Sequence, residues 1–230
     1  MSLAAEPSET ITTFDSATPF WRQLIVAQSI ISNQNKAVIP LLAAHLSDEN
    51  RHTRCNAAFA MAGLGDPRGF DAIVQVLSDK TDRPKGDGIT AGGWNLRKQI
   101  QADRYYAVHL LALLKDTKAT SVLAPLLTDK EVNYKVAWAL GESGDTNAIP
   151  PLISTLNDDD PDVRVLTINA LIALHAESAL PAIRALLKDT RRTHTGSQPT
   201  VAETAQKATV QLESKPQPPA GGDGKPAPQP

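Results

Sequence analysis

The side chains that most often carry metal chemistry are sparse in this 230-residue chain. The five histidines are His45, His52, His109, His175 and His194. None is followed by glutamate, whereas a dinuclear iron site on successive helices needs His-Glu pairs to supply imidazole and carboxylate ligands. The single cysteine, Cys55, excludes an internal disulfide and a cysteine-based metal cage. We therefore expect no metal and no cofactor.

An acidic run, Asp158-Asp159-Asp160 with Asp162, could be taken for a cation site. It coincides with a turn between two predicted helices, where aspartate caps the next helix and favours the positive end of its dipole. We interpret the run as capping. No glycine-rich phosphate loop, nucleophile elbow or pair of catalytic carboxylates stands in a convincing context. The sequence therefore predicts that the chain is not an enzyme.

The elements that must position these residues repeat along the chain. Five segments each close with an aspartate: Asp48, Asp79, Asp129, Asp158 and Asp189. Thirteen residues before each of these closing aspartates stands a turn position: Asn35, Asp66, Asp116, Asp145 and Ala176. Leucine or isoleucine recurs at offsets of seven and eleven from each turn position, which is one face of a helix. An alanine-rich segment precedes each turn position, so the unit is two helices of about 31 residues in all.

An arginine stands twelve residues before three of the turn positions, at Arg54, Arg104 and Arg164, and Asn133 replaces it in the fourth repeat. We expect these arginines to bridge carboxylates or turn carbonyls between consecutive repeats rather than to meet a ligand. A structural role is likewise expected for the aspartates Asp48, Asp66, Asp116, Asp129, Asp145 and Asp158. Gly-Asp is expected to form the turn within the unit.

These residues resemble the HEAT-like repeats found in phycobilin lyases and in many bacterial proteins. The run Asp160-Pro161-Asp162-Val163-Arg164, followed by Ala170-Leu171, matches the opening of that pattern closely. The resemblance covers roughly residues 19–189 and implies an all-α, right-handed αα-solenoid of about five helix pairs plus a terminal helix. Asn133 and Ala176 depart from the pattern and weaken a continuous series of Arg and Asp contacts.

The period is interrupted by an insertion at residues 80–99, which carries a net charge of +3. A smaller break runs from Arg191 to Thr200, and both breaks should leave from the same edge of the solenoid. We predict that they form a basic rim that contacts an acidic partner. The rim residues are Arg83, Lys85, Trp94, Arg97, Lys98, Arg191 and Arg192. The alternative, in which the insertion lies over its own scaffold, stays open.

Four aromatic residues, Tyr105, Tyr106, Tyr134 and Trp138, occupy outer positions of adjacent first helices. Aromatic rings bury a large area at low entropic cost, so a recognition patch is one interpretation. The other interpretation makes these rings the seat on which the insertion packs. Both stay open.

The second helices should line the concave face, at positions five and nine residues past each turn position. They are Pro40, Ala44, Asp71, Gln75, Ser121, Pro125, Pro150, Ser154, Pro181 and Ala185. None is basic, whereas nucleic-acid binding depends on Lys and Arg contacts to phosphate. The net charge of −2 also provides no field for nucleic acid or an anionic membrane. The concave face is therefore expected to suit a protein or an extended peptide.

We accordingly predict a protein-binding scaffold at residues 18–213, between an unstructured segment at 1–17 and a Pro- and Gly-rich tail at 214–230. An enzyme or enzyme accessory of the HEAT-like class, similar to a bilin lyase or a DNA glycosylase, is the alternative. No run of about 18 apolar residues predicts membrane insertion. The chain as written is expected to be soluble and cytoplasmic, or extracytoplasmic if its first residues replace a removed signal. The sequence sets neither the oligomeric state nor the partner.

Overall fold

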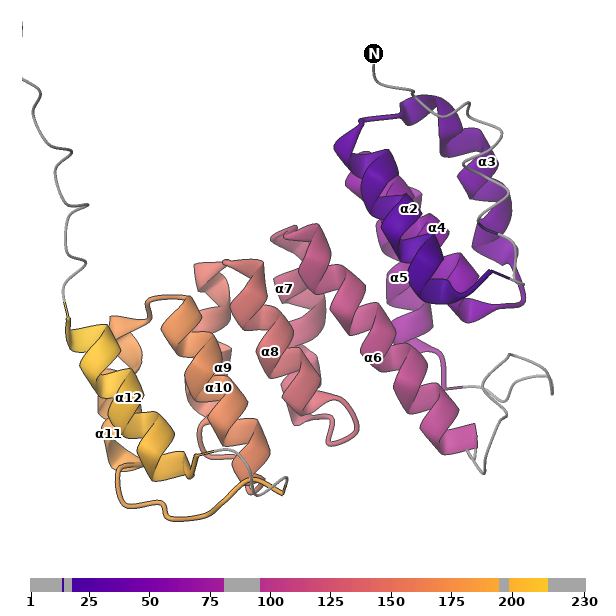
Figure 1. The fold of residues 1–230 in the computed structure, drawn as a ribbon. Helices are drawn as coiled ribbons and strands as arrows, with labels where there is room; N and C mark the ends of the chain where they lie inside the picture. The colour runs from indigo at the N-terminus through magenta and orange to yellow at the C-terminus, as the bar shows by residue number, and fades with distance from the viewer. Residues whose placement is uncertain (1–13, 15–17, 81–95, 195–198, 215–230) are drawn as a thin grey trace, which may run out of the picture.

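The computed structural model describes residue 14 and residues 18–80, 96–194 and 199–214, and every regular element in these ranges is a helix. Figure 1 shows α6, α8, α10 and α12 side by side in one layer, with the shorter α7, α9 and α11 behind them. The predicted all-α solenoid is confirmed. The first helices are α2 (Phe20–Ser32), α4 (Arg51–Gly63), α6 (Leu96–Leu114), α8 (Asn133–Ser143) and α10 (Pro161–Ala173), followed by the terminal α12 (Val201–Glu213).

Four of the five second helices are short, and 3-10 turns flank or extend them. They are α3 (Ile39–Ala44), α5 (Pro67–Ser78), α7 (Lys118–Leu123), α9 (Ile149–Thr155) and α11 (Leu180–Ala185). The turns are η2 (Lys36–Val38), η3 (His45–Ser47), η4 (Ala124–Thr128), η5 (Thr146–Ala148) and η6 (Glu177–Ala179). Proline occupies one of the first two positions of α3, α5, α9, α11 and η4. Because proline has no N–H to donate, it is tolerated in a first turn and starts each helix there.

The turn between the two helices of each repeat has the same backbone conformation in all five repeats. The residue before each turn position adopts a left-handed φ: Gln34 at 50°, Gly65 at 89°, Lys115 at 51°, Gly144 at 72° and His175 at 50°. Glycine takes this conformation without a steric penalty, whereas a residue with a Cβ is strained there. The predicted Gly-Asp turn therefore holds for two repeats, and the other three impose the same turn on side chains that disfavour it.

The aspartates of the repeat pattern close local turns. The closing aspartates Asp48, Asp129, Asp158 and Asp189 each accept the main-chain N–H of the residue two positions later. Asp66, Asp116 and Asp145 do the same at the start of the second helix. Short polar side chains are favoured at such positions because they satisfy N–H groups that have no partner in a helix. These contacts are local to each turn.

The apolar face of the second helices forms the seam between the two layers. Leu127 and Leu156 stand at the offset of eleven from their turn positions, and their side chains are buried there, with exposed fractions of 5% and 1%. Leu187 occupies the same position in the last pair but is 37% exposed, because a terminal repeat has a neighbour on one side only. Phe14 lies in the segment expected to be unstructured, yet its side chain is fully buried and its ring lies 6.0 Å from that of His45.

Candidate functional site

A side chain at the start of the first helix contacts the closing aspartate 25 residues later in three repeats. Arg104 Nη2 lies 2.7 Å from Asp129 Oδ2, and its Nε also donates to the carbonyl of Leu77 at 2.8 Å. Arg164 pairs with Asp189 at 3.0 Å, and Asn133 donates to Asp158 at 3.1 Å. Arg104 and Arg164 are buried. The charges of Arg104 and Arg164 are thus paired within the fold, and Asn133 makes the same contact with a neutral amide.

The second repeat differs, because a neighbouring arginine takes the closing aspartate. Arg51, one helical turn before Arg54, pairs with Asp79 through Nη2 and donates to it from Nε at 3.1 Å. Arg54 keeps a hydrogen bond from Nη1 to the carbonyl of Asp48 at 2.5 Å, but no ion pair between described residues includes it. Its side chain is half-buried, unlike those of Arg104 and Arg164. Arg54 is therefore the one arginine of this position whose charge is not paired with a closing aspartate among the described residues.

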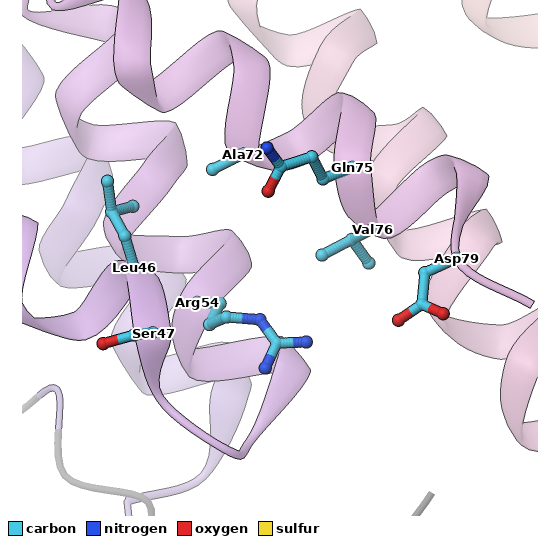
Figure 2. A pocket seen from close by; sticks show the side chains of 7 residues that line it. All are labelled: Leu46, Ser47, Arg54, Ala72, Gln75, Val76 and Asp79. Atoms are coloured by element: carbon cyan, nitrogen blue, oxygen red, sulfur yellow. The ribbon is translucent and has the colours of Figure 1, made fainter. Parts of the chain in front are cut away.

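Arg54 faces a pocket of about 350 Å³, called here the Arg54 pocket. Its lining residues are Leu46, Ser47, Arg54, Ala72, Gln75, Val76 and Asp79. Figure 2 shows Leu46 and Ser47 on one side, α5 with Ala72, Gln75, Val76 and Asp79 on the other, and the Arg54 guanidinium between them. The pocket thus lies between the second helices of the first two repeats, with the start of α4 supplying its cation.

The described residues of the Arg54 pocket include neither a thiol nor an imidazole. The cysteine of the chain lies elsewhere in α4, and burial raises the pKa of the Cys55 thiol to about 12. A thiol with so high a pKa is not a nucleophile at neutral pH. The groups that line the pocket are therefore suited to binding a ligand. They are a guanidinium, a hydroxyl and an amide beside apolar side chains.

The sequence-predicted basic rim is described only in part. Arg83, Lys85 and Trp94 lie outside the described residues, and so does the side chain of Arg97. Lys98 is exposed near the start of α6, and Arg192 is exposed in the loop before α12. Arg191 is paired with Asp189 at 2.9 Å. The first turns of α6 and α12 lie at the same edge of the solenoid (Figure 1). Whether the two breaks bind a partner stays a prediction.

The predicted aromatic group divides into separate contacts along the first helices. Tyr106 donates to Asn56 Oδ1 at 2.5 Å and packs edge-on against Phe20 with ring centroids 5.4 Å apart. Tyr105 meets Tyr134 at 5.2 Å. Trp138 stacks on His109 at 5.5 Å and lies under Lys135 Nζ at 3.7 Å from the ring centroid. These rings therefore join neighbouring first helices in three places.

Asp160, Asp162 and His194 place potential metal-ligand atoms within 4.8 Å of one another. Asp160 caps α10 by accepting the N–H of Asp162 at 2.8 Å. Asp162 in turn meets Nδ1 of His194 at 2.5 Å and accepts its main-chain N–H at 3.2 Å. The hydrogen bond to Asp162 and the charges of Asp160 and Asp162 raise the pKa of His194. Helix capping and anchoring of the loop after α11 account for this group.

Two family models match parts of the chain. The model described as HEAT repeats matches residues 128–195, and the model described as PBS lyase HEAT-like repeat matches residues 53–79. The second match contains Arg54, Ala72, Gln75, Val76 and Asp79, which are five of the seven residues that line the Arg54 pocket.

Curated relatives are about 30% identical to the chain within the segments that align. The bilin biosynthesis protein PecE of Nostoc sp. is 30% identical over 148 residues, which cover 63% of this chain and 54% of PecE. The protein YibA of Escherichia coli strain K12 is 31% identical over 166 residues, which cover 70% of this chain and 51% of YibA. The chain thus spans about half the length of the curated relatives it matches.

A solved structure has a similar fold. The complex of CpcE and CpcF of phycocyanin lyase from Nostoc sp. PCC7120 aligns with a TM-score of 0.51 and 25% identity, over 77% of this chain and 66% of the matched chain. No described helix is both long and apolar enough to cross a membrane.

These relatives contradict the prediction that the chain is not an enzyme, because they include components of a lyase. That prediction was based on the absence of local catalytic motifs, and a repeat scaffold that carries a site assembled from separate helices has no such motif to find. The repeats, their turns and the two family models agree with one another. The chain is therefore a HEAT-like repeat protein of the class that phycobilin lyases also contain.

Proposed function

We propose that this chain is a HEAT-like subunit of a lyase-type enzyme and that it acts together with a second protein. The observation that carries the proposal is the similarity to PecE and to the phycocyanin lyase structure, which is a complex of two proteins. A lyase-like activity that needs a second chain also agrees with the absence of a complete catalytic set in the Arg54 pocket. Bilins are the substrate class to which the names of these relatives point.

The surface available to the second protein is the row of second helices. All ten positions predicted for the concave face are exposed, from Pro40 in the first pair to Ala185 in the last. The wall they form carries no basic residue and several prolines, so it is rigid before a partner arrives. Binding to a preformed surface costs little conformational entropy. This wall is the partner-binding surface in the proposal.

An affinity-tagged chain, expressed in its own organism and analysed by mass spectrometry, tests the proposal. Two exposed positions on the proposed wall allow a charge to be placed there without disturbing the core, as Ser154→Arg and Ala185→Arg. Gln206→Arg places the same charge on the exposed face of α12 and is the matched control.

The wild-type chain and Gln206→Arg should recover the same second protein in near-equal amounts, and the two wall variants should recover at least about tenfold less. Equal recovery by all four proteins would place the partner elsewhere. Recovery of no protein in a stable complex would remove the two-protein part of the proposal.

A further inference from the structure

The Arg54 pocket contains a cation that the fold does not neutralise. In the three later repeats, the side chain at the position of Arg54 contacts the closing aspartate 25 residues later. The pairs are Arg104 with Asp129, Asn133 with Asp158 and Arg164 with Asp189. In the second repeat Arg51 takes Asp79 instead. Arg54 therefore retains N–H donors that point into a pocket of about 350 Å³, within the size range of small-ligand sites.

We propose that the Arg54 pocket binds a monoanionic carboxylate carried on an apolar body, either a free carboxylic acid or a carboxylate of a bound protein. The planar fork of a guanidinium group matches the two oxygens of a carboxylate. Ser47 and Gln75 also line the Arg54 pocket, and their hydroxyl and amide groups can hydrogen-bond the same carboxylate. Leu46, Ala72 and Val76 line the remainder and fit a short hydrocarbon chain.

The charges around the pocket select a single negative charge. Asp79 also lines the pocket, and Arg51 pairs with it, so Arg54 adds one net positive charge to that pair. Arg54 contacts the main-chain carbonyl of Asp48 and not its carboxylate, which lies 3.7 Å from His45 and accepts the N–H of Asn50. A single negative charge neutralises this net charge, and no other described cation lines the pocket to balance the second charge of a phosphate dianion. A carboxylate is therefore favoured over a phosphate.

This inference does not depend on lyase activity or on a second protein, and the two proposals are tested by different readouts. The probe is hexanoate, which has one carboxylate and a short alkyl chain, and hexan-1-ol is its uncharged counterpart. Binding is followed by NMR, through the Nε–H signal of Arg54 and the side-chain amide signals of Gln75. Hexanoate should shift both signals with a Kd in the millimolar range, as expected for a ligand of this size.

Three variants make the result specific. Arg54→Gln removes the cation, and Gln75→Glu places a competing carboxylate at an exposed position beside Arg54. Both should weaken hexanoate binding at least about tenfold, the loss of one charge-assisted contact. Arg68→Gln is the matched control, because Arg68 is an exposed arginine outside the pocket, paired with Asp66, and its loss should leave the Kd unchanged. Thermal melting confirms that each variant is folded.

The proposal is overturned if hexan-1-ol binds as well as hexanoate, if inorganic phosphate binds more tightly, or if Arg54→Gln leaves hexanoate binding unchanged. Two peptides then identify the source of the carboxylate: an amidated Leu-Glu-Leu peptide and its Leu-Gln-Leu counterpart. Tighter binding of the Glu peptide than of hexanoate supports a carboxylate from a bound protein. Tighter binding of hexanoate supports a free acid, and both results uphold the carboxylate site.

Discussion

Replacing Arg104 should destabilise the chain far more than replacing Arg54, although both occupy the same position of the repeat. The Arg104 side chain is 2% exposed and contacts the carbonyl of Leu77 at 2.8 Å, Asp129 at 2.7 Å and Glu131 at 3.3 Å. Methionine has a similar volume and keeps the packing, so Arg104→Met isolates the polar contacts. Removing one partner of a buried ion pair costs about 3–5 kcal/mol.

The expected loss for Arg104→Met is at the lower end of that range, about 3 kcal/mol, because Asp129 and Glu131 are partly exposed and recover water. Arg54→Met removes one hydrogen bond to a main-chain carbonyl at a half-buried site, which costs about 1 kcal/mol or less. Urea unfolding followed by circular dichroism measures both losses. Similar losses for the two variants, or a loss below about 1 kcal/mol for Arg104→Met, would refute the idea that only Arg104 is needed for the stability of the fold.

Three further outcomes follow from the geometry. Glycine at position 175, in place of histidine at φ 50°, should raise the free energy of unfolding by about 1 kcal/mol, and a decrease would show that other contacts of His175 outweigh the strain. Leu156→Ala should cost about 2–5 kcal/mol at the buried seam, and Leu187→Ala clearly less because its side chain is 37% exposed; equal costs in urea unfolding would contradict this register. The pKa of His194 should lie above its usual 6.5 in an NMR titration, and Asp162→Asn, which removes the largest cause, should lower it. Since the folded pKa is the higher one, this contact stabilises the fold fully below pH 6.5 and is lost as the pH rises through the raised value; a pKa unchanged by Asp162→Asn would refute the assigned cause.

The sequence predicts the architecture well because its signals are periodic and local. Leucines at fixed offsets define the buried face, and aspartates at fixed offsets define the turns, so neither depends on distant contacts. Gln34, Lys115 and His175 show the limit of this reasoning. Each has a Cβ, which disfavours a left-handed φ, so their residue types alone do not predict the conformation that the structure shows.

The candidate site could not be predicted in the same way, because it arises from competition between two side chains. Arg51 and Arg54 lie one helical turn apart; Arg51 pairs with Asp79, and Arg54 lines the same pocket as Asp79. The sequence pattern predicted that Arg54 contacts a carboxylate or a turn carbonyl, and Arg54 does donate to the carbonyl of Asp48, but it is Arg51 that pairs with Asp79. The presence of two arginines, Arg51 and Arg54, within one helical turn could have indicated that only one of them pairs with Asp79.

The lyase-type function is tested most directly by supplying a free bilin to the chain together with the protein that copurifies with it. We expect a time-dependent change in the absorption spectrum of the bilin that requires both proteins and is lost when either is heat-denatured. A bilin spectrum that stays unchanged over time in the presence of both folded proteins would contradict the proposed lyase-type function.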